Sequence, residues 1–116
     1  MILIVDDDAD IRTALGMVLA TRGYPSMEAR DGEQAMALLA AGVRPAVILL
    51  DMMMPGMNGW DFIAAAGQDQ HLSEIPVVAL TGYRSMVGEE PIPGTVGLLT
   101  KPVDIKRLLE ILARYR

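Results

Sequence analysis

The chain has 116 residues, no cysteine, a formal net charge of −5 at pH 7 and a hydrophobic content of 52%. Its length predicts one domain over residues 1–116 with one substantial hydrophobic core, and the lack of cysteine excludes disulfides and thiolate metal sites. The negative charge argues against direct nucleic-acid binding, which needs clustered lysine and arginine. No apolar run approaches the roughly 20 residues of a membrane span, so we expect a cytoplasmic protein without membrane contact.

Four short apolar runs, each bounded by polar or turn-forming residues, predict strands: Met1–Val5, Val47–Leu50, Val77–Leu80 and Val96–Leu99. Uninterrupted runs of this kind are typical of a parallel sheet buried on both faces. A weaker, short strand candidate is Tyr24–Ala29, which contains Pro25 and is therefore expected at a sheet edge.

Apolar residues at helical spacing lie between these runs and predict helices. The helices are expected to begin near Ile11, at an Asp31 N-cap, at Asn58 or Gly59, and at an Asp104 N-cap. Gln34 follows Asp31 by three residues, as in a capping box. The last helix is expected to turn one apolar face inward, formed by Ile105, Leu108, Leu109 and Leu112. Strands that alternate with helices indicate an α/β fold with a parallel sheet.

The segment between the fourth and fifth strands breaks this alternation. Residues 84–97 contain Pro91, Pro93 and three glycines, and inside a helix a proline costs about 3 kcal/mol and a glycine about 1 kcal/mol. We therefore expect an irregular or shortened fourth helix, with at most a turn or two around Arg84–Glu90.

Four of the five predicted strands end in polar groups. These are Asp6 and Asp7 after the first strand, Asp51 after the third, Thr81 after the fourth and Lys101 after the fifth. Parallel strands place these ends at one edge of the sheet, where carboxylates repel each other unless a hard cation such as Mg²⁺ neutralises them. A lysine and a threonine beside that cation are suited to holding a tetrahedral anion. The pattern therefore predicts phosphoryl transfer to a carboxylate.

Each of these groups has a simpler explanation when it is taken alone. The aspartates between residues 6 and 10 are suited to capping the first helix. Asp51 is suited to a strand-ending turn, and Lys101 to an ordinary surface position. Their joint arrival at one sheet edge favours a functional site over these separate roles.

The chain resembles the receiver domain of bacterial two-component response regulators, of the chemotaxis-receiver type, over essentially its full length. The resemblance rests on four motifs in the family's order and spacing: Ile-Val-Asp6-Asp7, Leu-Leu-Asp51-Met-Met-Met-Pro55-Gly-Met-Asn-Gly59, Ala-Leu-Thr81-Gly82 and Leu-Thr-Lys101-Pro102. It implies a flavodoxin-like, doubly wound five-stranded parallel sheet with strand order 2-1-3-4-5. The site is then expected at the switch point between strands 1 and 3.

The resemblance also implies a metal site for Mg²⁺. By position, Asp51 is the phosphoacceptor and a Mg²⁺ ligand, and Asp7 is a direct acidic ligand. Asp6 would act mainly through water, and Met53 would contribute only its backbone carbonyl.

The remaining roles implied by the resemblance concern the phosphoryl group and its source. Thr81 would move toward the phosphoryl group after transfer, and Lys101, before a typically cis proline bond, would bind a phosphoryl oxygen. The donor would be a sensor histidine kinase or a histidine phosphotransfer protein, and the output an effector domain or a downstream protein. The chain would be a monomer or weak homodimer, and no enzyme beyond its own phosphorylation and dephosphorylation.

One position departs from a common family pattern, and two others bear on how long the acyl phosphate lasts. Leu98 stands three residues before the lysine, where many receivers have a switch tyrosine or phenylalanine. Met53 and Tyr83 occupy positions that in the family influence how water reaches the acyl phosphate. An apolar methionine with a bulky tyrosine there leads to the hypothesis of slow self-dephosphorylation.

Two other functions compete with this interpretation. In a haloacid-dehalogenase-like phosphatase, Asp6 would be the nucleophile and Asp8 the acid, but Asp10 replaces that family's expected threonine and Asp51 is left without a role. The second alternative is a receiver-like binding module that signals without phosphorylation. Failure to bind Mg²⁺ would distinguish this module from a receiver.

Overall fold

The computed structural model describes residues 1–82 and 92–115, which form a five-stranded sheet covered by helices on both faces. The strands are β1 (Ile2–Val5), β2 (Ser26–Ala29), β3 (Val47–Asp51), β4 (Val77–Thr81) and β5 (Gly97–Thr100). The α-helices are α1 (Ala9–Thr21), α2 (Gly32–Ala40), α3 (Gly59–Gly67) and α5 (Ile105–Leu112), with short 3-10 turns at Leu72–Glu74 and Ala113–Tyr115. All strand pairs are parallel, in the order β2-β1-β3-β4-β5. The predicted fold class and strand order are therefore confirmed.

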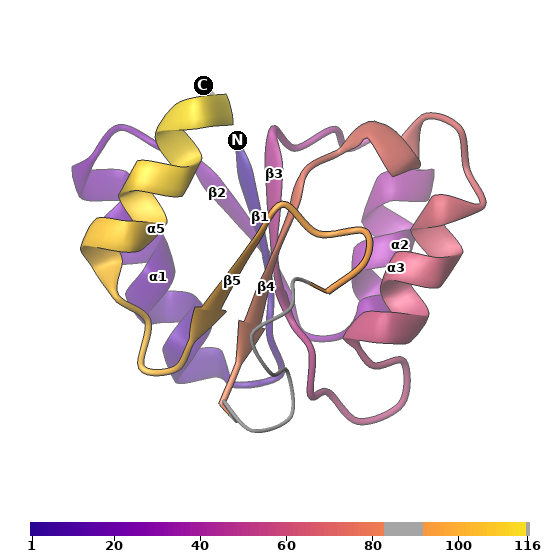
Figure 1. The fold of residues 1–116 in the computed structure, drawn as a ribbon, viewed down its shortest axis with the longest axis horizontal. Helices are drawn as coiled ribbons and strands as arrows, with labels where there is room; N and C mark the ends of the chain where they lie inside the picture. The colour runs from indigo at the N-terminus through magenta and orange to yellow at the C-terminus, as the bar shows by residue number, and fades with distance from the viewer. Residues whose placement is uncertain (83–91, 116) are drawn as a thin grey trace.

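Helices α1 and α5 cover one face of the sheet, and α2 and α3 cover the other (Figure 1). Side chains alternate between these faces along β1 and β3: Leu3, Val5, Ile48 and Leu50 pack toward α2 and α3, and Ile2, Ile4, Val47 and Leu49 toward α1 and α5. Fully burying such a side chain contributes about 1.5–3 kcal/mol. Two cores on opposite faces explain why these strands are uninterrupted apolar runs.

Strand β2 is shorter than predicted and lies at a sheet edge. Its pairing begins at Ser26, since the carbonyl of Pro25 accepts the Ile2 N–H at 2.9 Å and proline itself has no N–H to donate. The Asp31 side chain caps α2 by accepting the Gln34 N–H at 2.7 Å. Gln34 does not return this bond to Asp31, as a capping box requires, because its side chain accepts the N–H of Arg30.

The chain after β4 agrees with prediction in its irregular part and differs slightly in its last helix. Residues 92–96 form no helix or strand, and β5 begins one residue later than predicted. In α5 Leu108 and Leu112 are buried and Ile105 and Leu109 half-buried, and the buried Ile111 was not among the predicted residues. The predicted turn at Arg84–Glu90 lies outside the described residues. Within the described part of the chain, no helix is long and apolar enough to span a membrane.

A close contact between β3 and α3 fixes the loop that follows Asp51. The Gly59 N–H donates to the Met52 carbonyl at 3.2 Å, and a Cβ on Gly59 would lie 2.7 Å from the Met52 Cα. Across the loop, the Glu33 carboxylate accepts the Met57 N–H at 3.2 Å. The start of α3 can approach the end of β3 this closely only with glycine at position 59.

Candidate functional site

The polar strand ends meet at the carboxyl edge of the sheet. β1 and β3 are hydrogen-bonded neighbours with Val5 opposite Leu50, so the residues that follow these two, Asp6 and Asp51, are also adjacent. The chain leaves β1 for α1 on one face, and α2 precedes β3 on the other face (Figure 1). This is the switch point of the doubly wound sheet, where ligands bind in such folds.

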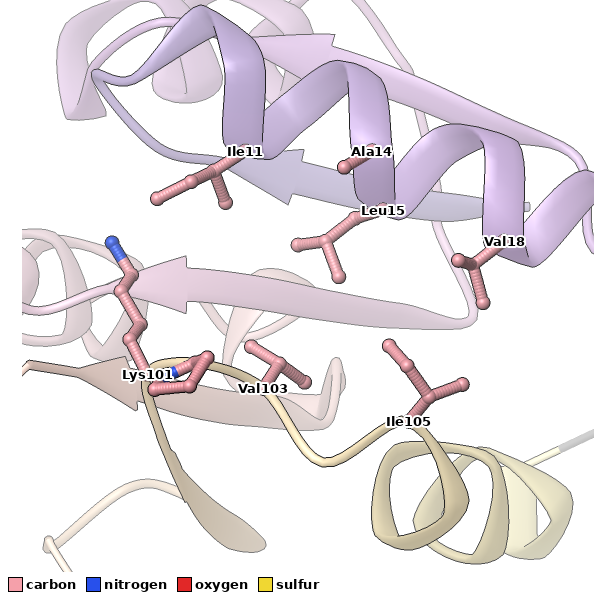
Figure 2. A pocket seen from close by; sticks show the side chains of 8 residues that line it. Ile11, Ala14, Leu15, Val18, Lys101, Val103 and Ile105 are labelled. Carbon is pink, nitrogen blue, oxygen red and sulfur yellow. The ribbon is translucent and has the colours of Figure 1, made fainter.

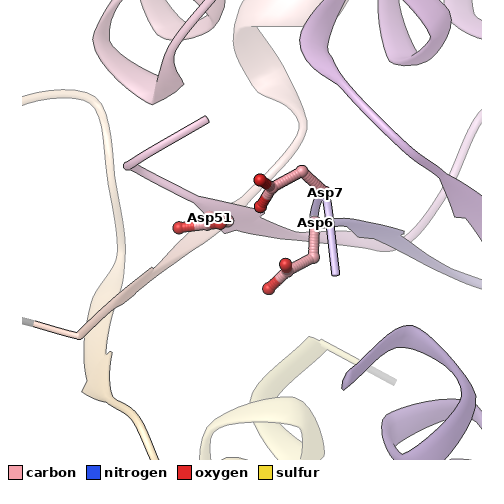
Figure 3. Close-up of side chains that lie close together, drawn as sticks. All are labelled: Asp6, Asp7 and Asp51. Atoms are coloured by element: carbon pink, nitrogen blue, oxygen red, sulfur yellow. The ribbon is translucent and has the colours of Figure 1, made fainter. Parts of the chain in front are cut away.

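Three carboxylates converge at this point. One oxygen from each of Asp6, Asp7 and Asp51 lies within 4.8 Å of the others, and Figure 3 shows the side chains turned toward a common space. Asp6 is 0% and Asp51 3% exposed, whereas Asp7 is exposed. Backbone N–H groups hold the buried pair, because Asp51 Oδ1 accepts from Met53 at 3.0 Å and Asp6 Oδ1 accepts from Asp8 at 2.9 Å.

Lys101 brings the only ammonium group that is paired with this cluster among the described residues. Its Nζ lies 2.7 Å from Asp6 Oδ2 and 3.4 Å from Asp51 Oδ2. The Lys101 N–H donates to the Thr81 carbonyl at 2.7 Å, which extends the β4–β5 ladder to the site. The Lys101–Pro102 peptide is cis, as the resemblance implied.

The surroundings shift the pKa values of Asp51 and Lys101 in the same direction for different reasons. Burial and the nearby Asp6 charge raise the pKa of Asp51 to about 6, against the lowering effects of the Met53 N–H and Lys101. Burial alone would lower the pKa of Lys101, but its hydrogen bond to Asp6 and the charge of Asp51 raise it above the ordinary value. At neutral pH the site therefore holds a charged lysine and a largely ionised Asp51.

Thr81 and Met53 lie where the sequence placed them, at the edges of this cluster. Thr81 ends β4, one position beyond Leu80, the residue opposite Asp51, and it is 2% exposed. The Met53 side chain is 42% exposed while its N–H is bound to Asp51. The role of the Met53 carbonyl stays a prediction. Tyr83, its expected partner at the site's entrance, lies outside the described residues.

Sequence reasoning missed Arg12, which lies one turn into α1. Its Nη1 donates to the Asp6 carbonyl at 2.7 Å, and its Nε lies 3.2 Å from Glu28 Oε1 on β2. The sequence offered one signal for this contact: Arg12 is a cation four residues after Asp8, on the helix that follows the acidic pair. That signal alone does not separate Arg12 from a surface arginine.

The three-carboxylate cluster fits a hard divalent cation. If all three aspartates are ionised, Lys101 balances one of three negative charges, and a 2+ ion balances the remainder. Within the described part of the chain, the buried Asp6 Oδ2 has the Lys101 ammonium, at 2.7 Å, as its close partner. Two oxygens on one Mg²⁺ lie at most about 4.2 Å apart, so small side-chain adjustments bring the cluster to ligand spacing. Carboxylate oxygens are the ligands that Mg²⁺ prefers.

An apolar groove of about 490 Å³ adjoins the site. One wall comes from α1, and the other comes from the loop between β5 and α5 (Figure 2). It is lined by Ile11, Ala14, Leu15, Val18, Pro102, Val103 and Ile105, with Lys101 at the end beside Ile11. Because Lys101 also pairs with Asp6 and Asp51, it is shared by the groove and the carboxylate cluster.

Known proteins with the same fold and related sequences include several signalling regulators. The chain is 41% identical to the DNA-binding response regulator MtrA of Mycobacterium tuberculosis, a match that covers 99% of this chain and 48% of MtrA. It is 31% identical to sporulation initiation phosphotransferase F of Bacillus subtilis, with 98% and 91% covered. The solved chemotaxis response regulator CheY4 of Vibrio cholerae has a TM-score of 0.84 at 32% identity, with 99% and 97% covered.

The family assignment rests on more than these pairwise matches. The chain spans about half the length of the transcriptional and DNA-binding regulators that it matches but nearly the full length of the phosphotransferase. A family model described as "Response regulator receiver domain" matches residues 2–113. The chain therefore belongs to the receiver domains of two-component response regulators.

Proposed function

We propose that this receiver domain accepts a phosphoryl group on Asp51 in a Mg²⁺-dependent reaction, with a phosphohistidine on a partner protein as donor. The observation that carries the proposal is the grouping of three carboxylate oxygens within 4.8 Å with Lys101 paired to two of the same side chains. This is a negatively charged cluster with one paired ammonium group, placed at the end of a buried strand. Such a cluster suits a divalent ion and a phosphoryl group together.

The proposed transfer is a displacement at phosphorus. An oxygen of the ionised Asp51 forms a bond to phosphorus as the bond between phosphorus and the donor's imidazole nitrogen breaks, and the electron pair stays on that nitrogen. The product is an acyl phosphate on Asp51. Attack of water on this phosphorus later releases inorganic phosphate and restores the carboxylate. The chain thus acts as an acceptor within a relay and not as an enzyme for an independent substrate.

The residues around Asp51 divide the work of binding. Asp6, Asp7, Asp51 and the Met53 carbonyl would hold Mg²⁺, which supplies neutralisation of the charge on the phosphoryl oxygens. Lys101, which now bridges Asp6 and Asp51, would turn to a phosphoryl oxygen. The Thr81 hydroxyl would bind another oxygen of the same group after transfer.

The donor is proposed to be a sensor histidine kinase or a histidine phosphotransfer protein. A phosphohistidine that reaches Asp51 must bring its protein over the surface around the site, and the apolar groove beside Lys101 is part of that surface. The chain's relatives include DNA-binding regulators, so an effector domain or a downstream protein is the proposed output. Direct nucleic-acid contact by the receiver itself is not proposed.

A phosphatase with Asp6 as nucleophile and Asp8 as acid fits this site less well. The Asp8 carboxylate caps α1 by accepting the N–H groups of Asp10 at 2.9 Å and Ile11 at 3.3 Å. Asp8 Oδ1 is therefore engaged at the start of the helix, a role that needs no catalysis.

The proposal is tested by incubating the protein with acetyl phosphate, with and without Mg²⁺, and measuring the intact mass. We expect one added phosphoryl group in the presence of Mg²⁺ and none in EDTA. Asp51→Asn should not be labelled, and Asp6→Asn should be labelled more slowly than the wild type. Labelling that survives in Asp51→Asn but not in Asp6→Asn would support the phosphatase, and a protein that binds no Mg²⁺ would support the phosphorylation-independent module.

A further inference from the structure

Arg12 links three elements at the acidic end of the site. It lies on α1, its Nη1 donates to the backbone carbonyl of Asp6 at 2.7 Å, and its Nε pairs with Glu28 on β2 at 3.2 Å. The Arg12 side chain is 17% exposed, so the guanidinium is packed into this position. A planar guanidinium that makes two directed contacts has little freedom to move.

The carbonyl that Arg12 binds belongs to the peptide unit between Asp6 and Asp7. Because a peptide unit is planar, a bond to the Asp6 carbonyl also sets the direction in which the chain enters Asp7. The other end of the same residue is fixed by the sheet, since the Asp6 N–H donates to the Ala29 carbonyl at 3.2 Å. The backbone that carries both metal-site aspartates is thereby held on each side.

The orientation of the Asp7 carboxylate depends more on the backbone than that of Asp6 does. Asp6 is buried, with one carboxylate oxygen on the Asp8 N–H and the other beside Lys101. Asp7 is exposed, and its carboxyl group interacts with Asp51. The backbone direction is therefore the main determinant of where the Asp7 carboxylate points.

We propose that Arg12 is a positioning residue for the metal site: its bond to the Asp6 carbonyl holds the Asp6–Asp7 peptide so that the Asp7 carboxylate faces the cation. Glu28 orients the guanidinium for this bond. The inference rests on the Mg²⁺ site of the proposed function, and it concerns the affinity of that site before any phosphoryl transfer.

The sign of the effect separates positioning from simple charge. Arg12 is a cation near the cluster, so through charge alone its removal would tighten Mg²⁺ binding. Positioning predicts the opposite, because a loosened Asp7 is a poorer ligand. Removing a group that orients metal ligands typically weakens metal affinity by about 10- to 100-fold.

The experiment measures Mg²⁺ dissociation constants by titration calorimetry for the wild type, Arg12→Gln and Arg12→Lys. We expect both variants to bind Mg²⁺ about tenfold more weakly, because lysine keeps the charge but lacks the planar pair of donors. Arg44→Lys is the matched control. Arg44 also donates to backbone carbonyls, those of Leu39 and Val43, but it precedes β3 and so lies at the amino end of that strand, away from the site. This variant should bind Mg²⁺ as the wild type does.

A second measurement tests whether the effect passes through Asp7. In an Asp7→Asn background, Arg12→Gln should change Mg²⁺ affinity by less than about twofold, since the ligand that it positions is already lost. Thermal unfolding in EDTA shows which variants are folded. If Arg12→Gln does not fold, the Mg²⁺ affinity of Arg12→Lys tests the positioning role.

The outcomes distinguish this inference from the proposed function. If the wild type binds no Mg²⁺, the proposed function fails and the inference fails with it. If the wild type binds Mg²⁺ and the folded Arg12 variants bind it equally well or more tightly, only the positioning role is overturned. An undiminished Arg12→Gln effect in the Asp7→Asn background would also overturn it.

Discussion

Lys101 lies closer to Asp6 than to Asp51, with its Nζ 2.7 Å from Asp6 Oδ2 and 3.4 Å from Asp51 Oδ2. Asp6 is fully buried, and an ionised carboxylate in that environment needs a cation nearby. In the metal-free protein, Lys101 therefore stabilises the charge of Asp6 as well as that of the proposed phosphoacceptor. This double role ties the stability of the fold to the occupancy of the site.

Replacing Lys101 with methionine should destabilise the metal-free protein. The change keeps most of the side-chain volume but leaves the three carboxylates without their counter-charge, and we expect a loss of about 1–3 kcal/mol in the free energy of unfolding. Added Mg²⁺ should restore more stability to Lys101→Met than to the wild type, because the ion replaces the missing charge. Urea unfolding in EDTA and in Mg²⁺ measures both quantities. Equal stability of the two proteins in EDTA would contradict the role given to this ion pair.

The Asp51→Asn substitution should stabilise the metal-free protein in a pH-dependent way. The pKa of Asp51 is raised from 3.8 to about 6, so the folded state favours the protonated form, which asparagine resembles. Below the unfolded pKa of Asp51 the two proteins should be equally stable. As the pH rises through about 6, the wild type loses stability and the variant gains an advantage of about 1–2 kcal/mol, after allowance for solvent screening.

Urea unfolding in EDTA at about pH 4 and about pH 8 measures this difference. Titrations shared by both proteins cancel in the comparison, which leaves the contribution of Asp51. An advantage of the variant that is the same at both pH values would mean that packing, and not the charge of Asp51, is responsible.

Mg²⁺ affinity should fall as the pH decreases through about 6. In the proposed site protons and Mg²⁺ would compete for the Asp51 carboxylate, whose pKa is raised to about 6 by burial and by Asp6. Calorimetry across this range should show an apparent dissociation constant that rises by up to about tenfold for each pH unit below the pKa. An affinity that is constant down to about pH 5 would contradict this competition at Asp51.

The apolar groove beside Lys101 should matter for a protein donor and not for a small one. Ala14 lines the groove on α1, and we expect Ala14→Asp to slow phosphoryl transfer from the cognate kinase about tenfold, because the interface would bury an unpaired charge. Labelling by acetyl phosphate should be unchanged. Met17→Asp is the matched control, since Met17 is 65% exposed on the same helix and does not line the groove. Equal slowing by both substitutions would show that the groove has no special part in donor binding.

Gly59→Ala should destabilise the protein by about 1–3 kcal/mol, because the start of α3 would have to move away from Met52. A Cβ at this position would lie 2.7 Å from the Met52 Cα. Gly67→Ala at the other end of α3 is the control, as a Cβ there meets nothing within 4 Å; its stability should stay within about 1 kcal/mol of the wild type. Urea unfolding of the three proteins tests the difference, and equal midpoints would contradict this account of the β3–α3 contact.

Much of the architecture could be predicted from the sequence because the sheet is buried on both faces. The strand runs near Val47 and Val77 are uninterrupted and end in polar groups, which is enough to predict that Asp51 and Thr81 lie at one edge of a parallel sheet. The order of the strands and the role of each site residue came from the family resemblance, since alternating strands and helices are compatible with several sheet orders. The structure places the predicted site residues together, and their roles stay proposals.

The remaining details depend on three-dimensional packing. The contact of Arg12 with Glu28 crosses 16 residues of chain, and no local pattern predicts which arginine packs against the edge strand. The closer approach of Lys101 to Asp6 than to Asp51 likewise could not be predicted, since in the strand order β5 is nearer to β3 than to β1. The predicted capping box at Asp31 failed for a similar reason. The Gln34 side chain accepts the N–H of Arg30 and not that of Asp31.

The most direct test of the central claim is to identify the residue that carries the phosphoryl group. The protein is labelled with acetyl phosphate in Mg²⁺ and reduced with borohydride, which converts an aspartyl phosphate to homoserine, and its peptides are then sequenced by mass spectrometry. We predict homoserine at position 51, with aspartate retained at positions 6 and 7. Homoserine at position 6, or no labelled aspartate in a protein that binds Mg²⁺, would contradict the assignment of Asp51 as phosphoacceptor.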